Sequence, residues 1–473
     1  MAHLYISAAH KSSGKTTLSI GLCAALRAAG DRVQPFKKGP DYIDPLWLGK
    51  AAGRACHNLD FYTMQRAEIS DLFADKMQGA DIGLIEGNKG LYDGLALDGS
   101  NSNAALAAQL GSPIVLVLDS QGMTRGVAPL ILGYQAFDPT IRIVGVILNK
   151  VGGSRHEAKL RADIEHYTDA RVVGAVQRSD ELVISERHLG LVPSNELSGG
   201  QADIDRMARL IRDSVDLPEL RNLAASAGVP PPAVSAAPPA RPEADRVRIA
   251  YASDSAFGFY YAGDLEALQA AAVELVPFSP LRDRDLPACD GLFLGGGFPE
   301  THMDGLEKNS SMRAAVAAFV ERGGPVYAEC GGLMYLADSL TWEGKTRKMV
   351  GVIPAGVMMH PKPQGRGYVR LRETAAHPWP LSGDGSEAIS AHEFHYSALR
   401  QVPEGLDFAY RVERGQGLDG VHDGIVYRNL LASYAHLRDT RSHPWAERFV
   451  DFVRRCRGRG AWVRRQGRDT GEG

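Results

Sequence analysis

A loop near the amino terminus has the residue types and spacing of a phosphate cradle. It reads AHKSSGKTT from Ala9 to Thr17 and matches the pattern G-x-x-x-x-G-K-[ST], with Ala9 in place of the first glycine. In such loops backbone N–H groups surround phosphate oxygens, the lysine reaches the outer phosphates and the hydroxyl binds Mg²⁺. The helix expected to begin near Thr17 adds its N-terminal dipole. The predicted ATP contacts are Ser12, Ser13, Gly14, Lys15, Thr16 and Thr17.

Acidic residues follow two later apolar runs. Asp41 and Asp44 stand in the segment FKKGPDYIDP, and Glu86 ends the run 82–86. A carboxylate at a strand end opposite a phosphate loop is where the Mg²⁺ of a nucleotide is usually held. Taken alone, Asp41 and Asp44 are more typical of Asx turns. Several acids near one phosphate site instead favour metal-assisted phosphoryl transfer, and Asn149, after a further apolar run, is a weaker candidate for reading the base.

Cys330 stands between an apolar run and two glycines, in the segment AECGGLMYL. This context is typical of a nucleophile elbow, in which the turn is sharp and the neighbours must be small. A helix N-terminus behind the thiol is expected to lower its pKa. Core burial is the usual alternative for a cysteine, but the glycines favour a nucleophile. A second glycine run follows residues 291–294, and free N–H groups there suit an oxyanion hole built from Gly296, Gly297 and Gly331.

A thiol nucleophile needs a general base. The downstream candidates are His360, His392, His395, His422, His436 and His443. His436 follows a short apolar run, whereas His443 precedes a proline and is typical of a helix start. Spacing favours His436 and leaves His443 open.

Composition limits the class of protein. The 473 residues carry a net charge of −3, with 23% charged and 44% hydrophobic residues, so the chain can bury large cores and global disorder is excluded. With no apolar run long enough to span a membrane, and a near-neutral balance, we expect neither a membrane nor a nucleic-acid partner. The five cysteines are scattered, which favours a reducing compartment and predicts a cytoplasmic protein.

Both halves alternate short apolar runs with helical patterns. Because the runs are continuous, they predict central strands of parallel sheets buried on both faces. The expected fold class is therefore α/β, with two doubly wound domains of mainly parallel sheets joined by a proline-rich linker. The expected strands cover residues 4–7, 33–36, 82–86, 114–119 and 143–149, then 248–251, 274–278, 291–294 and 326–328. The expected divisions are a first domain at 1–225, a linker at 226–245, a second domain at 246–453 and a basic tail at 454–473. We interpret the tail as a frayed terminus rather than an anion-binding patch.

The chain resembles the cobyrinic acid a,c-diamide synthases, in which a P-loop domain of the dethiobiotin synthetase type is fused to a class I glutamine amidotransferase-like domain. The resemblance runs from about residue 4 to 440 and rests on motifs in order, among them GKTT, QPFKKGPDYIDP, IEGNKGLYDG, LGGGFPE, AECGGLMYL, HEFHYS and LASYAHL. It implies that ATP phosphorylates a substrate carboxylate and that ammonia from glutamine displaces the phosphate. The implied co-substrates are ATP, L-glutamine and a tetrapyrrole carboxylate, with Mg²⁺ as cofactor and a homodimer as a possible assembly.

The resemblance also implies roles for particular residues. Cys330 would attack the glutamine side-chain amide, with His436 as the base. Many class I enzymes have a glutamate two residues after that histidine, where this chain has Arg438, so a Cys–His pair is expected and the orienting group stays unassigned. The residues implied to hold the metal are Thr16, Asp41 and Glu86, and those implied to handle the substrate and its acyl phosphate are Asp44, Asp93 and Tyr42.

The ring that is amidated is open at this level. Cobyrinate is the leading prediction, for its a and c acetates. A sirohaem or other sirohydrochlorin-type substrate is the close alternative, because SAAHKSSGKTT and the paired Lys37-Lys38 depart from the usual family pattern and resemble a branch linked to sulfur oxidation. Two further alternatives are a P-loop ATPase switch with a non-catalytic amidotransferase-like domain and a tetrapyrrole carrier without turnover.

Overall fold

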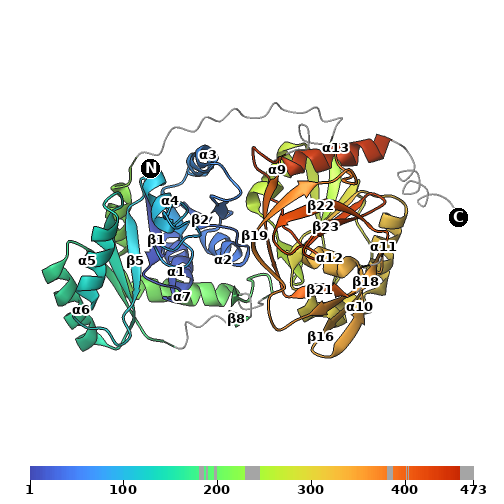
Figure 1. Cartoon of the computed structure of the whole chain (residues 1–473). Helices are drawn as coiled ribbons and strands as arrows, with labels where there is room; N and C mark the ends of the chain where they lie inside the picture. The colour runs from blue at the N-terminus through green and yellow to red at the C-terminus, as the bar shows by residue number, and fades with distance from the viewer. Residues whose placement is uncertain are drawn as a thin grey trace. The chain divides into compact units, whose positions relative to one another are not determined.

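The computed structural model describes residues 1–179, 186–187, 190–196, 200–228, 246–380, 387–400, 402 and 404–458. The chain divides into two compact units, Met1–Ala236 and Ala237–Gly473 (Figure 1). Residues 229–245 of the expected linker and 459–473 of the expected tail lie outside the described residues. In the described ranges, no helix combines the length and apolarity needed to cross a bilayer.

The first unit is built on a parallel sheet. Every described neighbouring pair of strands in this sheet runs parallel, as the continuous apolar runs predicted. In sheet order the seven strands found among the described residues are β3 (His57–Leu59), β2 (Val33–Lys38), β4 (Ile82–Glu86), β1 (His3–Ala8), β5 (Ile114–Asp119), β6 (Ile143–Val151) and β7 (Arg171–Gln177).

Helices cover both faces of this sheet. On one face α1, α2 and α7 pack together, and Figure 1 shows α1 and α7 side by side. On the other face α3 to α6 share a hydrophobic core with the strands. The unit's helices are α1 (Lys15–Ala28), α2 (Ile43–Ala52), α3 (Arg66–Lys76), α4 (Asn103–Leu110), α5 (Val127–Phe137), α6 (Ser154–Tyr167), α7 (Gly200–Ser214) and α8 (Leu217–Ala225), and β8 (Glu186–Arg187) pairs with β9 (Gly190–Leu191).

Strand register brings the expected phosphate-handling residues to one edge. Lys37 pairs with Glu86 across β2 and β4, and Asp119 pairs with Asn149 across β5 and β6. The loop after β1 leaves the sheet at the same edge, because β1 runs parallel between β4 and β5. Ligands of open α/β sheets bind beyond the carboxyl ends of strands, so this edge is where a nucleotide would bind.

The sheet of the second unit is mixed. Its first five described strands run parallel, and they include all four strands expected in this half. Four antiparallel strands, which the continuous-run criterion did not predict, extend the sheet. The parallel strands in sheet order are β12 (Val273–Phe278), β10 (Val247–Ala252), β13 (Gly291–Leu294), β15 (Val326–Glu329) and β24 (Leu430–Ser433), and the antiparallel ones are β23 (His422–Tyr427), β22 (Asp407–Arg414), β19 (Gly365–Glu373) and β20 (Ile389–His395).

The other elements of the second unit surround this sheet. Its short strands are β11 (Phe257–Phe259) paired with β14 (Gly296–Gly297), and a separate small sheet of β17 (Lys345–Lys348), β16 (Ala337–Trp342), β18 (Ile353–Met359) and β21 (Ser397–Arg400). Its helices are α9 (Ala262–Ala270), the 3-10 turn η3 (Pro299–His302), α10 (Met303–Lys308), α11 (Ser310–Glu321), α12 (Gly331–Leu336) and α13 (Trp445–Gly458).

Helix α13 corrects one expected boundary. The tail was expected to begin at residue 454, but the helix continues through that position to Gly458. The physical reason is packing, because Val453 and Cys456 on the inner side of the helix are buried in the core of the unit. At the other boundary the chain after α8 is still attached to the first unit at Gly228, whose N–H donates to Gly111 O at 2.9 Å.

Candidate active sites

The phosphate loop lies between β1 and α1 and has the backbone that its sequence predicts. Ser12 and Gly14 have φ of 67° and 87°, which is the left-handed region that glycine adopts without strain. A side chain at Gly14 would also overlap the amide nitrogen of Asn149. At Ala9, which stands where the motif usually has its first glycine, the carbonyl accepts a hydrogen bond of 2.6 Å from the Tyr134 hydroxyl.

The side chains of the loop point to neighbouring backbone in this structure. The Ser13 hydroxyl donates to His10 O at 2.8 Å. Lys15 Nζ donates to Lys89 O at 2.6 Å, and burial lowers its pKa while nearby carboxylates oppose that shift. Thr17 lies in the first turn of α1, which begins at Lys15 rather than at Thr17. These residues surround the position that a polyphosphate would take in a P-loop.

A buried lysine to which the sequence analysis gave no role in the site holds the acidic residues together. Lys37 Nζ lies 3.1 Å from Glu86 Oε1 and 3.7 Å from Asp41 Oδ2, and it also bonds to Asp44 Oδ2. Although burial lowers its pKa, Asp44, Glu86 and Asp41 raise it well above the ordinary value. The Thr16 hydroxyl donates to Glu86 Oε1 at 2.7 Å. The five side chains therefore form one charged cluster beside the phosphate loop.

Asp41 serves two purposes in this cluster. Its Oδ1 accepts the N–H groups of Ile43 and Asp44 at 2.9 and 3.1 Å, which is the Asx turn that spacing alone favoured. Its Oδ2 faces Lys37. Enclosure of the carboxyl group and the neighbouring Asp44 raise the pKa of Asp41 to about 7.

The chemistry of this cluster fits Mg²⁺. Glu86 Oε2 is buried and has no hydrogen-bond partner within the described residues, so one carboxylate oxygen is left to bind a cation. In the described part of the chain, no three carboxylate, imidazole or thiol groups already surround a single point. Mg²⁺ does not require such a cage, because it usually binds one or two carboxylates together with phosphates and water. The predicted set of Thr16, Asp41 and Glu86 is found together, with Asp44 beside Thr16 as a further candidate.

The remaining predicted residues of the first unit lie around the cluster. Tyr42 is buried at the N-terminus of α2. Asp93 is exposed and caps its own loop by accepting the Gly90 N–H at 2.8 Å, while its charge acts on Lys15. The Asn149 amide donates to Ser13 O at 2.9 Å. Asn149 therefore braces the phosphate loop, and this contact does not support the expected role in reading the base.

Cys330 occupies a strained elbow between β15 and α12. Its φ of 46° and ψ of −99° are outside the regions that side chains favour, at a cost of about 1–3 kcal/mol. Strain of this kind persists when the surrounding structure requires the conformation. Here the Cys330 N–H donates to Ser433 O of the neighbouring strand β24 at 2.8 Å. The sequence-based expectation of an elbow at Cys330 matches this backbone.

The glycines around Cys330 are needed for close approach. A Cβ added at Gly331 would lie 2.9 Å from Gly297 N, and one at Gly296 would lie 2.7 Å from Cε1 of His436. A side chain at Gly332 would overlap Leu294 O. The predicted oxyanion residues Gly296, Gly297 and Gly331 are thus brought together at the elbow, next to the imidazole.

His436 follows β24, whose carboxyl end adjoins that of β15. Its ring stacks on His392, with ring centroids 5.0 Å apart and an angle of 18° between the planes. His443, the alternative base, lies near the start of α13, where its charged neighbours are Arg448 and Glu373. Burial lowers the pKa of His443 to about 3. The structure therefore brings His436, not His443, to the glycine loop beside Cys330.

The thiol pKa differs from the sequence-based expectation. Burial raises the pKa of Cys330, and the neighbouring carboxylates of Glu300 and Glu329 raise it further. The Gly331 N–H acts in the opposite direction but does not outweigh burial and the two carboxylates. The expectation of a lowered pKa was wrong. Cys330 must pass its proton to a base as it attacks.

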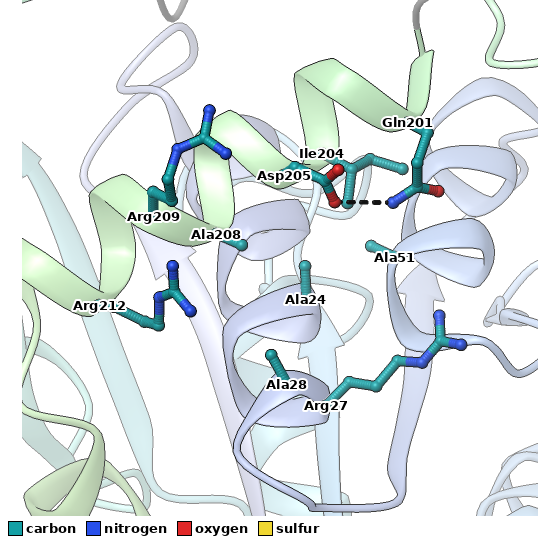
Figure 2. A pocket seen from close by; sticks show the side chains of 10 residues that line it. All are labelled: Ala24, Arg27, Ala28, Ala51, Gln201, Ile204, Asp205, Ala208, Arg209 and Arg212. Atoms are coloured by element: carbon teal, nitrogen blue, oxygen red, sulfur yellow. Dashed lines mark hydrogen bonds between the residues drawn. The ribbon is translucent and has the colours of Figure 1, made fainter.

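A surface groove in the first unit lies away from this chemistry. It has a volume of about 570 Å³ and contains Arg27 and Ala24 of α1, facing residues of α7 across it (Figure 2). Both α1 residues stand near the C-terminal end of the helix, whereas the phosphate loop is at its N-terminus. The groove is lined by Ala24, Arg27, Ala28, Ala51, Gln201, Ile204, Asp205, Ala208, Arg209 and Arg212.

Comparison with known proteins places both units in described families. Residues 6–192 match the CobQ/CobB/MinD/ParA nucleotide binding domain, and residues 248–442 match the CobB/CobQ-like glutamine amidotransferase domain. The cobyrinate a,c-diamide synthase of Magnetococcus marinus is 48% identical over 459 residues, which are 95% of this chain and 97% of that protein. The cobyrinate a,c-diamide synthases of Methanosarcina acetivorans and Methanothermobacter thermautotrophicus are each 39% identical, over 96% and 92% of this chain and 95% and 96% of those proteins.

The fold and the two sites define a glutamine amidotransferase-type protein, in which a P-loop nucleotide-binding domain is joined to a domain with a cysteine on an elbow. The chain belongs to the cobyrinate a,c-diamide synthase family, since it shares 48% identity with a member over almost the full length of both proteins. The predicted family and fold class are confirmed.

Proposed function

We propose that the chain is a glutamine-hydrolysing amide ligase that amidates the a and c acetate carboxylates of cobyrinate with ATP. The observation that carries this proposal is the 48% identity with a cobyrinate a,c-diamide synthase over 95% of the chain, with both the phosphate loop and the cysteine elbow intact. The other two relatives described above carry the same name. That agreement favours cobyrinate over a sirohaem-type ring.

The second unit would release ammonia from glutamine. Cys330 attacks the side-chain amide carbon and passes its proton to His436, which returns it to the departing nitrogen, so a glutamyl thioester and ammonia form. N–H groups among Gly296, Gly297 and Gly331 would stabilise the negative charge on the carbonyl oxygen. Water then hydrolyses the thioester, releasing glutamate and restoring the thiol.

The first unit would activate the carboxylate that receives the ammonia. A carboxylate oxygen attacks the γ-phosphorus of ATP, giving an acyl phosphate and ADP, and ammonia then displaces phosphate to form the amide. Lys15 and the loop of Ser12, Ser13 and Gly14 would hold the phosphates, with Thr17 in the first turn of the helix behind them. Asp44, Asp93 and Tyr42 are the candidates for substrate contacts at this edge.

Mg²⁺, when bound, would neutralise charge on the phosphates, with Thr16, Glu86 and Asp41 as the residues to hold it. Lys37 would then keep the remaining carboxylate charge balanced, because it contacts all three acidic side chains of the cluster.

The two sequence departures that suggested another ring make contacts within the first unit. The Ala9 carbonyl accepts a hydrogen bond from the Tyr134 hydroxyl. Lys37 binds the acidic cluster, while burial lowers the pKa of the second lysine, Lys38, to about 8, with the charges of Asp60 and Lys89 acting on it in opposite directions. Neither departure identifies a ring by its own contacts, so we retain cobyrinate as the proposed substrate.

We also infer a homodimer that acts in the cytoplasm. Helix α5 carries no charged residue, and it exposes the side chains of Leu132 and Phe137, which are 43% and 74% accessible. If two copies met along this uncharged helix about a twofold axis, the contact would bring no like charges together. All five cysteines are unpaired, which suits a reducing compartment and a working thiol.

The test is to incubate the full chain with ATP, Mg²⁺, glutamine and one macrocycle at a time, using cobyrinic acid, sirohydrochlorin and sirohaem. Mass spectrometry should detect the replacement of two hydroxyl groups by amines on cobyrinic acid. Product only from a sirohydrochlorin-type ring would move the substrate assignment to that branch. No product from any ring would favour an ATPase switch if ATP is hydrolysed, and a carrier if it is not.

A further inference from the structure

We propose that Glu329, the residue directly before the nucleophile, is the positioning carboxylate for His436. This inference rests on the proposed glutaminase function. Nδ1 of His436 lies 3.2 Å from Oε2 of Glu329, and each side chain is only 3% exposed. The position two residues after the histidine, where many class I amidotransferases have a glutamate, is held by Arg438, whose guanidinium lies 5.0 Å over the ring of Tyr261.

The carboxylate of Glu329 is fixed by three donors. Oε1 accepts the Leu437 N–H at 2.9 Å and the Tyr327 hydroxyl at 2.5 Å, while Oε2 accepts the His436 Nδ1–H. Tyr327 lies two residues earlier on β15, and side chains two apart on a strand share a face of the sheet. Strand β15, which leads to the nucleophile, thus also positions the Glu329 carboxylate and the Tyr327 hydroxyl that bonds to it.

This arrangement sets the tautomer of the base. With the proton on Nδ1 held by Glu329, the lone pair is on Nε2, which is the atom that must accept the thiol proton. The carboxylate also stabilises the imidazolium that forms. His392 stacks on the same ring but does not replace it as a base, because burial and the nearby His436 and Arg438 lower its pKa well below the ordinary value.

The test measures glutaminase kinetics on the full-length Glu329→Gln variant. We expect kcat to fall roughly 10²-fold or more with little change in KM for glutamine, and Glu329→Asp to recover part of it. Without the carboxylate the imidazolium is less stable, so the acidic limb of the pH profile of kcat/KM should move to lower pH. Amidation driven by ammonium salts should stay at the wild-type rate, since the synthetase unit is unchanged.

Glu393→Gln is the matched control. Glu393 is equally buried and accepts the Gln416 and Gly417 N–H groups, at 2.7 and 2.8 Å. It is not bonded to His436, so its variant should keep kcat within about threefold even if the protein is less stable.

The outcomes separate the inference from the proposed function. A wild-type chain without glutaminase activity would overturn the proposed function itself. An active wild type with kcat of Glu329→Gln within threefold, or an unmoved pH profile, would overturn the role of Glu329. If Glu329→Gln does not fold, Tyr327→Phe removes one support of the carboxylate, and kcat should fall about 3- to 10-fold. An unchanged kcat in that variant would equally contradict the inference.

Discussion

Lys37 Nζ lies 3.1 Å from Glu86 Oε1 at the carboxyl ends of two neighbouring strands, and both side chains are almost fully buried. The same ammonium also contacts Asp41 and Asp44, so one positive charge is shared among three carboxylates. A cation brought by the nucleotide would enter a site that is already negatively charged. Lys37 should therefore affect both the stability of the first unit and its affinity for a cation.

Replacing Lys37 with methionine should destabilise the chain by about 3–5 kcal/mol, because it leaves buried carboxylates without their partner. Mg²⁺ should recover more of the melting temperature in this variant than in the wild type, as the metal replaces the lost charge. Differential scanning calorimetry with and without Mg²⁺ measures both effects. Lys159→Met, on the exposed side of α6, is the control and should change neither. If Mg²⁺ raised the melting temperatures of Lys37→Met and of the wild type equally, that would contradict a cation site in the cluster.

Glu86→Gln should abolish amidation while leaving glutamine hydrolysis detectable. The Thr16 hydroxyl and Lys37 both bond to this carboxylate, and its second oxygen is the proposed metal ligand. Loss of a group that stabilises transition-state charge typically costs about 10²-fold or more in rate. Amide product and free glutamate are measured in the same reaction. Loss of both activities in a folded variant would contradict the division of labour between the two units.

The pH dependence of stability should reflect Asp41. Its pKa is raised to about 7 in the folded chain, so the folded state binds its proton more tightly than the unfolded state. The resulting stabilisation is complete below about pH 4 and is lost as the pH rises through 7. Asp41→Asn keeps the side-chain acceptor for the turn but carries no charge. In a sample without nucleotide, its free energy of unfolding at pH 8 should therefore exceed that of the wild type by more than about 1 kcal/mol. Denaturant titrations at pH 4 and pH 8 test this, and a difference that does not grow with pH would refute it.

Gly331→Ala should impair glutamine hydrolysis. The new Cβ would lie 2.9 Å from Gly297 N, in the region proposed to hold the oxyanion. We expect a loss of about 10²-fold in kcat, comparable to removal of one oxyanion-hole donor. Gly263→Ala is the matched control, because an added Cβ there meets nothing within 4 Å. Equal kcat values for the two variants would exclude close packing at Gly331 as a requirement of the site.

Phe137→Glu should shift the chain to a monomer if α5 forms the dimer interface. A charge on this uncharged helix would be repeated by symmetry and buried against its copy. Light scattering coupled to gel filtration measures the mass, with Arg155→Glu on the exposed start of α6 as the control. A wild-type chain that is itself a monomer at micromolar concentration would exclude the proposed dimer.

The sequence was sufficient to predict the parts that depend on local pattern. Continuous apolar runs predicted the parallel strands, and the glycines around Lys15 and Cys330 predicted both turns because few other residues fit such backbones. The antiparallel strands β19, β20, β22 and β23 were missed, since polar residues interrupt each of them and none is a continuous apolar run.

Roles that depend on tertiary pairing could not be predicted in this way. Glu329 is adjacent to Cys330 in the sequence, but its partner His436 is 107 residues away, and only strand pairing brings them together. The pKa of Cys330 depends on burial and on Glu300, neither of which spacing reveals. The FKKGPDYIDP motif contained Lys37, yet only the fold shows that this lysine is buried among three carboxylates.

The most direct test of the account is the transfer of nitrogen from glutamine to the macrocycle. Wild-type chain is incubated with ATP, Mg²⁺, cobyrinic acid and glutamine labelled with heavy nitrogen in its side-chain amide, and the product is analysed by mass spectrometry. The account predicts labelled amides at both acetates with the wild type, and none with Cys330→Ser unless ammonium is added. Labelled product from Cys330→Ser, or unlabelled amides from the wild type, would contradict it.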